Sequence, residues 1–207
     1  MRPLVAISCR VQDERRYVER RDALDQRWPP FLHACGLTPI LLPNHMQSAR
    51  EIMRTIPVSG VILSGGDSLV AYGGHTPERD AVEQMVLAHC VVHGLPVIGV
   101  CRGMQVLLHD QGGTLAPLEN HVATEHVLDN GRVVNSYHTL GLRSVPDGFE
   151  AQASAMDGSI EALCHARLPW WGMMWHPERA TDGFAKEDIA LFRHVFGVDL
   201  ETQGTTQ

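Results

Sequence analysis

Short apolar runs alternate with longer stretches of helical periodicity along the first half of the chain. The apolar runs contain β-branched residues, as buried strands do, and cover residues 3–8, 37–42, 60–63 and 95–100. Between and after them, apolar residues recur at three- and four-residue spacings over residues 18–35, 47–55, 77–93 and 102–111. Because parallel strands need crossover connections, this alternation predicts an α/β fold: a central, mostly parallel sheet with helices on both faces.

The second half of the chain has a different pattern. Four β-like pieces follow one another over residues 132–137, 149–155, 160–164 and 170–175, separated by turn signals such as Asp129-Asn130-Gly131. They predict a small antiparallel β section arranged as a meander. A helix over residues 186–195 is expected to close a single domain of residues 1–200, with a frayed tail over 201–207.

Composition and charge narrow the class of protein. The chain has 207 residues and a formal charge of -7, which is unfavourable for binding nucleic acid. No apolar run is long enough to span a membrane, and the N-terminus has no signal-peptide pattern, so a cytoplasmic protein without a membrane partner is expected. Five scattered cysteines, none in a C-x-x-C pair, predict neither a disulfide framework nor a cysteine zinc site.

One of the five cysteines, Cys101, lies in a sequence pattern that is typical of a catalytic nucleophile. Cys101 follows the apolar run 95–100 and precedes a helical stretch, with Gly99 and Gly103 two residues to either side. This is the pattern of a nucleophile elbow, in which small residues let strand and helix pack closely around a strained turn. The N-terminus of the helix also favours an anion, and therefore the thiolate. The alternative interpretation is one more buried thiol.

A histidine and a carboxylate near the end of the chain could complete a catalytic triad. A thiolate nucleophile needs an acid/base histidine that a third group orients. His176 and Glu178 are two residues apart, and Pro177 between them restricts the backbone, so both side chains can face one cleft.

These motifs together resemble the class I glutamine amidotransferase superfamily. The elbow around Cys101, the His176-Pro177-Glu178 end and the upstream Leu63-Ser64-Gly65-Gly66 match in order and approximate spacing. The resemblance implies a flavodoxin-like fold, a Cys101–His176–Glu178 triad and an oxyanion hole made by the backbone N–H groups of Gly66 and Arg102. It implies no cofactor.

The branch that the sequence resembles most is the γ-glutamyl hydrolases, because Arg102 directly follows the nucleophile, and Gly66-Asp67 and the motif Pro77-Glu78-Arg79-Asp80-x-x-Glu83 precede it. Such enzymes cleave a γ-glutamyl amide through a γ-glutamyl thioester and release glutamate. By the same resemblance, Gln105 and the segment Asn135-Ser136-Tyr137-His138 are expected to line the glutamyl pocket, with Gln105, Ser136, Tyr137 and His138 binding the substrate.

A shorter pattern near the N-terminus resembles the hydrolases of capsule phosphoramidate synthesis, which act on γ-glutamyl-CDP-amidate. It consists of Ile7-Ser8-Cys9-Arg10 followed by an arginine-rich segment from Tyr17 to Trp28. Arg10, Arg20 and Arg21 are therefore expected to bind the substrate, since guanidinium groups match phosphate oxygens. A solvated helix face is the plainer interpretation of the segment.

Other functions stay open. A glutaminase subunit that delivers ammonia to a separate synthetase would use the same chemistry, as would a hydrolase of another small conjugate such as γ-glutamyl-aminobutyrate. A homodimer is an open alternative. A catalytically silent interaction domain is disfavoured by the intact triad. Metal catalysis is not predicted: His89 and His93 are four residues apart, but no H-E-x-x-H motif or Cys/His cluster accompanies them.

Overall fold

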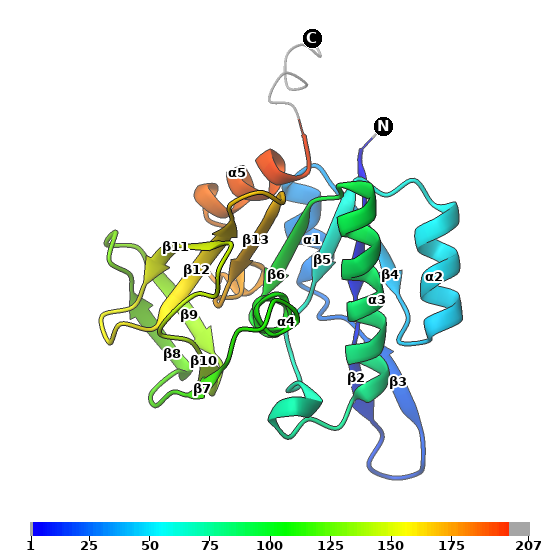
Figure 1. Ribbon diagram of the computed structural model, residues 1–207, viewed down its shortest axis with the longest axis horizontal. Coiled ribbons are helices and arrows are strands. Elements are labelled where there is room, and N and C mark those ends of the chain that lie inside the picture. The colour runs from blue at the N-terminus through cyan, green and yellow to red at the C-terminus, as the bar shows by residue number, and fades with distance from the viewer. Residues whose placement is uncertain (1, 199–207) are drawn as a thin grey trace.

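A seven-stranded sheet forms the centre of the computed structural model, which describes residues 2–198 (Figure 1). The strand order is β11-β12-β13-β6-β5-β1-β4. Five strands run parallel: β1 (Leu4–Ser8), β4 (Thr38–Leu42), β5 (Gly60–Leu63), β6 (Val97–Val100) and β13 (Trp170–Met173). The antiparallel strands β12 (Ile160–His165) and β11 (Phe149–Ser154) extend one edge. This arrangement confirms the predicted α/β class.

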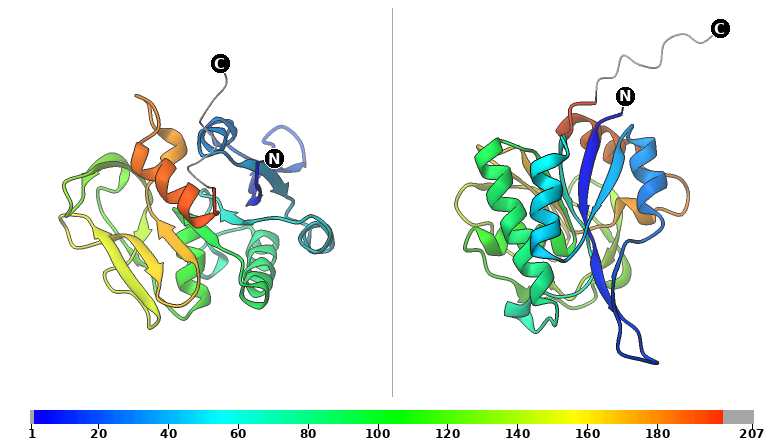
Figure 2. Two further views of the ribbon diagram at one scale, coloured as in Figure 1. Left: turned by 90° about the horizontal axis from the view of Figure 1, so that it is seen from above. Right: turned by 90° about the vertical axis from the view of Figure 1, so that its right-hand side faces the viewer.

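Helices cover both faces of the sheet (Figure 2). On one face lie α2 (Met46–Thr55), α3 (Pro77–His93) and α4 (Arg102–Asp110), and on the other α1 (Trp28–Ala34) and α5 (Lys186–Val195). Each face has its own apolar core, because successive strand side chains point to opposite sides. In β1, Ala6 packs in the core beneath α2 and α3, whereas Val5 and Ile7 pack with α1 and α5.

Two short antiparallel pairs lie beside the sheet in the second half of the chain. They are β8 (Val122–Val127) with β9 (Val133–Tyr137), and β7 (Ala116–Pro117) with β10 (Leu140–Gly141). The expected antiparallel meander is nevertheless present: the last three predicted pieces form it as β11, β12 and β13, and only the piece over residues 132–137 pairs elsewhere, as β9 with β8. The predicted strands over 149–155, 160–164 and 170–175 belong to the main sheet, and β13 pairs in parallel with β6.

The predicted helix over residues 18–35 is wrong in its first half. Strands β2 (Arg10–Asp13) and β3 (Arg20–Ala23) form a hairpin that extends past the end of the sheet (Figure 1), and α1 begins only at Trp28. Before Trp28 the segment offers few apolar side chains to bury, and a short helix without packing is marginal in water. Pro29 and Pro30 then occupy the first positions of α1, where proline is tolerated.

Two 3-10 turns complete the described chain, η1 (Val70–Tyr72) and η2 (Pro177–Arg179). Among residues 2–198, no helix is both long enough and apolar enough to cross a bilayer. The predicted frayed tail, 201–207, and the end of the predicted domain at residue 200 lie outside the described residues.

Candidate active site

Cys101 occupies a strained turn between β6 and α4. Its backbone has φ 52° and ψ -106°, a conformation that residues with a side chain rarely adopt. The Cys101 N–H donates to the Met173 carbonyl at 2.7 Å, which fixes the turn against the neighbouring strand β13. The side chain is almost buried, with 6% of its surface exposed, and it precedes the first turn of α4.

The glycines two residues before and after Cys101 allow strand and helix to approach each other. A Cβ atom on Gly99 would lie 2.5 Å from the carbonyl carbon and oxygen of Gly103. A Cβ on Gly103 would lie 2.0 Å from the Leu63 carbonyl oxygen of β5. Both contacts are with backbone, which cannot move aside cheaply, so this turn requires glycine at both positions.

His176 and Glu178 form a buried pair next to the turn. The His176 Nδ1 atom lies 2.7 Å from Glu178 Oε1, and both side chains are nearly inaccessible to solvent. Asn135 of β9 holds the backbone of His176 on both sides: its Oδ1 accepts from the His176 N–H at 2.9 Å, and its Nδ2 donates to the His176 carbonyl at 2.9 Å. The imidazole is thus fixed by its partner and by its backbone.

The environment of His176 favours the charged imidazolium. Burial by itself lowers the pKa of His176, but hydrogen bonds with the Cys101 thiol and the Glu178 carboxylate, together with their charges, raise that pKa to about 9. Below this pH the site therefore holds a proton on His176, between the Cys101 side chain and the Glu178 carboxylate.

The loop after β5 approaches this pair with its backbone. A Cβ on Gly65 would lie 2.5 Å from His176 Cε1 and 3.4 Å from Cys101 Cβ, so only glycine fits there. Gly66 has φ +84° and lies against the guanidinium of Arg10, whose atoms would be 3.2 Å from a Cβ on Gly66. The backbone of Gly65 is therefore placed beside the thiol and the imidazole, and that of Gly66 beside Arg10.

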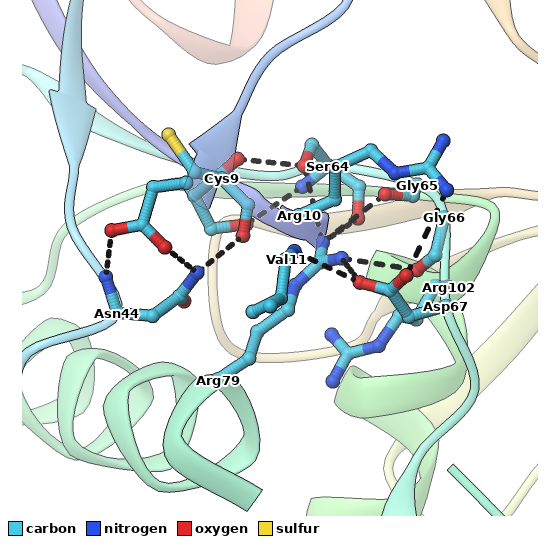
Figure 3. A network of polar contacts seen from close by, with 12 residues as sticks. Cys9, Arg10, Val11, Asn44, Ser64, Gly65, Gly66, Asp67, Arg79 and Arg102 are labelled. Atoms are coloured by element: carbon cyan, nitrogen blue, oxygen red, sulfur yellow. Dashed lines mark hydrogen bonds and ion pairs between the residues drawn. The ribbon is translucent and has the colours of Figure 1, made fainter. Parts of the chain in front are cut away.

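Arg79, a fully buried arginine of α3, forms hydrogen bonds with the backbone of the loop after β5 (Figure 3). Arg79 donates through its two terminal nitrogens to the carbonyl oxygens of Ser64 at 2.7 Å, Gly65 at 3.2 Å and Gly66 at 3.0 Å. It also pairs with Asp67 Oδ2 at 3.0 Å. With three successive carbonyls engaged by one side chain, the loop has little freedom to rotate its peptide planes.

The charge of Arg79 is balanced within the same network. Its Nε donates to Glu83 Oε1 at 3.0 Å, one helical turn along α3, and Arg102 contacts both Glu83 and Asp80. Burial disfavours the charged form of Glu83, yet the two arginines outweigh it and lower the pKa of that carboxyl. Arg79 and Glu83 belong to the Pro77–Glu83 motif that supports the resemblance, which gave neither a structural role; their four-residue spacing is the signal for an ion pair on a helix.

A cavity of about 450 Å³ opens beside Cys101 and His176. It brings together six more of the residues singled out from the sequence: Arg10, Gly66, Arg102, Gln105, Tyr137 and His138. Gln105 donates from Nε2 to the Leu140 carbonyl at 2.9 Å, and the ring of Tyr137 meets the ring of His176 edge-on at 5.8 Å between centroids.

Three predicted substrate-binding residues do not line this cavity. Ser136 is fully buried and its hydroxyl donates to the His121 carbonyl at 2.7 Å, so its contacts are internal. Arg20 pairs with Glu78 at 2.6 Å and with Asp13 at 3.2 Å on the β2–β3 hairpin. Arg21, on the same hairpin, pairs with Glu19 at 2.5 Å and donates to the Tyr17 hydroxyl at 2.7 Å.

A second cavity of about 730 Å³ adjoins the first. The two share Tyr137, His176 and Arg179, and the Arg179 guanidinium carbon lies 4.8 Å from the centre of the Tyr137 ring. Arg179 was not predicted from the sequence, and Asn135 was expected only to line the glutamyl pocket, not to hold His176. The position of Arg179 directly after Glu178 was the available signal, whereas nothing in the sequence marks Asn135 as the partner of His176.

Comparison with models of known protein families identifies the family of this chain. The model of the family described as glutamine amidotransferase class-I matches residues 31–195. The chain belongs to this family. Membership confirms the predicted family and its enzyme class, a glutamine amidotransferase-type hydrolase.

Individual relatives of this chain have different names. The γ-glutamyl-CDP-amidate hydrolase of Campylobacter jejuni is 32% identical over 126 residues, 59% of this chain and 63% of that protein. The γ-glutamyl-γ-aminobutyrate hydrolase of Escherichia coli is 27% identical over 202 residues, 77% of this chain and 79% of that protein. The matches to several GMP synthases span only 28–33% of those longer proteins.

A solved structure supports the fold of this class I amidotransferase domain. A protein of Thermoplasma acidophilum described as a putative GMP synthase subunit superposes with a TM-score of 0.69 at 17% identity. The superposition covers 95% of this chain and 94% of that chain. At this identity the likeness concerns the fold alone.

Proposed function

We propose that this chain is a cysteine hydrolase that cleaves a γ-glutamyl amide bond, with Cys101 as nucleophile, His176 as acid and base, and Glu178 as the group that orients His176. The observation that carries the proposal is the placement of Cys101 on a strained turn beside the buried His176–Glu178 pair, at the wall of a cavity. A nucleophile, its base and an orienting carboxylate are the minimum set for covalent amide hydrolysis.

The first half of the reaction forms a thioester. Cys101 Sγ attacks the side-chain carbonyl carbon of the γ-glutamyl group, and the carbon–nitrogen bond breaks as the leaving nitrogen takes the proton from His176. Negative charge develops on the carbonyl oxygen, and the N–H groups of Gly66 and Arg102 stabilise it. Arg102 is the first residue of α4, so its N–H has no acceptor within that helix.

The second half releases glutamate. A water molecule transfers a proton to His176 and attacks the thioester carbon, after which the carbon–sulfur bond breaks and the Cys101 thiolate is restored. Gln105 and Tyr137 lie on the cavity wall where the amino and carboxylate groups of the glutamyl part would bind, and His138 forms part of the same wall.

For the leaving group, the proposal is cytidine diphosphoramidate, so that the substrate is γ-glutamyl-CDP-amidate. Two observations support it: the resemblance to the Campylobacter relative of that name, and the guanidinium groups of Arg10 and Arg179 on the cavity wall. The Arg10 side chain is 46% exposed, so it is available to a diphosphate. The localisation proposed for such an enzyme is the cytoplasm.

A second function is a glutaminase subunit that supplies ammonia to a synthetase. The observation that favours it is the match to about a third of the length of longer GMP synthases, which points to one part of a larger enzyme. A third, γ-glutamyl-aminobutyrate hydrolysis, is favoured by the Escherichia coli relative.

The test is release of free glutamate by the purified chain from γ-glutamyl-CDP-amidate, L-glutamine and γ-glutamyl-aminobutyrate, each compared with Cys101→Ala. The proposal expects Cys101-dependent turnover with the highest kcat/KM for γ-glutamyl-CDP-amidate. If kcat/KM is higher for γ-glutamyl-aminobutyrate, the proposed leaving group is wrong, but the proposed cleavage of a γ-glutamyl amide by Cys101 still holds. Absence of turnover with all three would overturn a stand-alone hydrolase and favour the glutaminase subunit.

A further inference from the structure

Three histidines and a glutamate converge behind the wall of the 450 Å³ cavity, and the reaction proposed above leaves their convergence unexplained. They are His121 before β8, His126 within β8, His138 after β9 and Glu161 in β12, and one ligand atom from each lies within 4.8 Å of all the others. His121, His138 and Glu161 are all at least 96% buried.

The hydrogen bonds at the outer edges of two rings determine which nitrogens face inward as acceptors. His121 Nε2 lies 3.3 Å from Asp157 Oδ2, and His138 Nδ1 lies 3.2 Å from the Leu140 carbonyl oxygen. A carboxylate and a carbonyl accept only, so these outer nitrogens carry the protons. In the neutral rings, His121 Nδ1 and His138 Nε2 therefore present lone pairs to the interior.

Those lone pairs face each other and a carboxylate. His121 Nδ1 and His138 Nε2 are 3.4 Å apart, and each lies 3.6 Å from Glu161 Oε1. Three acceptors that converge in a buried site repel one another unless a cation or a proton lies between them. A shared proton draws a pair of atoms to about 2.7–3.2 Å and serves only one pair at a time.

The spacing matches a metal ion better than a proton. Tetrahedral zinc, with bonds of about 2.0–2.1 Å to nitrogen and oxygen, holds its ligand atoms about 3.3–3.4 Å from one another. His126 adds a fourth donor: its ring lies tilted at 46° to that of His121 with 4.1 Å between centroids, and its Nε2 is buried without a hydrogen-bond partner in the described part of the chain.

We propose that His121, His126, His138 and Glu161 bind one tetrahedral divalent cation, with zinc as the ion that this set of donors selects. Imidazole and carboxylate ligands in tetrahedral geometry are typical of zinc. The outer contacts with Asp157 and with the Leu140 carbonyl are those that orient metal-bound histidines. Four protein ligands leave no open position, so the ion is structural and takes no part in the hydrolysis.

The ion would fasten the cavity wall to the sheet. His126 and His138 come from the β8–β9 region, which also carries Tyr137 toward His176, whereas Glu161 belongs to the main sheet. Binding to the folded state alone would raise its stability. This inference does not depend on the proposed reaction.

The test uses tag-free, chelator-treated protein in the Cys101→Ala background, because the Cys101 thiolate could itself bind zinc. Zinc binding is measured by calorimetry and by elemental analysis after gel filtration, and the apparent melting temperature is measured with and without zinc. We expect one ion per chain and a higher melting temperature with zinc. In the same background, cobalt should give the strong visible absorption of a tetrahedral site.

Variants separate this site from other histidines. Glu161→Gln and His126→Asn should each weaken zinc binding by at least about 100-fold, and Asp157→Asn, which removes an outer partner, by about 10–100-fold. His89→Asn with His93→Asn changes a second histidine pair, on α3 with ring centroids 4.1 Å apart, and should leave affinity and stoichiometry unchanged.

Two results would overturn the site. One is the absence of stoichiometric zinc uptake by the parent protein, which needs no folded variant to interpret. The other is a Glu161→Gln protein, folded by circular dichroism, that binds zinc as tightly as its parent.

Discussion

At the scale of single residues, the site depends on His176 having two different neighbours. Glu178 accepts a hydrogen bond from one side of the imidazole, and the Cys101 thiol lies on the other, where their interaction raises the pKa of His176 to about 9. In the proposed mechanism, the proton that the leaving nitrogen takes is therefore already bound to His176 at neutral pH. Loss of either neighbour should change the acid and base behaviour as well as the rate.

Glu178→Gln tests this arrangement. An amide has no charge to stabilise the imidazolium, so the high-pH limb of kcat/KM, expected near pH 9 in the parent, should move to lower pH. The rate should fall less than in Cys101→Ala, since Glu178 orients a catalytic group and forms no bond with the substrate. A pH profile identical to that of the parent, or a larger loss than in Cys101→Ala, would contradict the assigned roles.

Arg10→Ala tests the proposed leaving group. Arg10 lines the cavity and is half-exposed, so loss of its guanidinium should raise KM for γ-glutamyl-CDP-amidate by about tenfold or more and leave KM for glutamine nearly unchanged. Arg10→Lys should restore part of the loss.

Arg21→Ala is the matched control, because Arg21 lies on the hairpin and pairs with Glu19 away from the cavity. A rise in KM for Arg21→Ala equal to that for Arg10→Ala would show that the hairpin also binds the substrate, as the sequence pattern predicted.

At the scale of elements, the spacing of apolar residues predicted helices correctly where one face of the helix is buried against the sheet. Helix α3 coincides with its predicted range of 77–93 and α5 with 186–195, because each has an apolar face that the sheet covers. The charged segment before Trp28 has no such face, and its hairpin contacts distant residues such as Glu78. Local periodicity contains no information about partners so far along the chain.

The residues of the candidate sites also differ in whether a local sequence pattern could predict them. Cys101, His176 and Glu178 belong to short motifs with a characteristic order, so the sequence marks them. The cluster of His121, His126, His138 and Glu161 has no metal-binding motif, since its members come from separate strands that only the folded chain brings together. The expectation of no metal site followed from this lack of local spacing.

The buried Arg79 network yields a prediction about the loop after β5. Arg79→Gln leaves Glu83 without one of its cations and frees the carbonyls of Ser64, Gly65 and Gly66, so the free energy of unfolding should fall by about 3–5 kcal/mol. Arg54→Gln removes an exposed ion pair with Glu51 and should change the free energy of unfolding by less than about 1 kcal/mol. Urea unfolding of both variants measures the difference, and equal effects would contradict a structural role for Arg79.

At the scale of the whole molecule, the site gathers at the carboxyl ends of the parallel strands. Cys101 follows β6 and the Gly65-Gly66 loop follows β5, which are neighbours in the sheet, and His176 follows β13 on the other side of β6. Parallel α/β sheets bind ligands at this edge. His176, which the proposed mechanism uses as acid and base, also affects the stability of the fold, because its pKa is higher in the folded chain than in the unfolded one.

This coupling predicts how global stability depends on pH. The pKa of His176 is about 9 in the folded chain and about 6.5 when unfolded, so the contribution of its protonation is fully present below about pH 6.5. It is lost as the pH rises through about 9. The free energy of unfolding should fall over this range more steeply for the parent than for His176→Asn, as measured by urea unfolding. Parallel curves for the two proteins would contradict the raised pKa.

The most direct test of the account compares Cys101→Ala with Cys164→Ala in steady-state release of glutamate from the preferred γ-glutamyl substrate. Cys164 is partly exposed on β12 and serves as the matched thiol outside the site. The account predicts that Cys101→Ala lowers kcat by at least about 1,000-fold while the protein stays folded, and that Cys164→Ala retains the parental rate. Substantial turnover by folded Cys101→Ala would contradict the central claim that this thiol is the nucleophile.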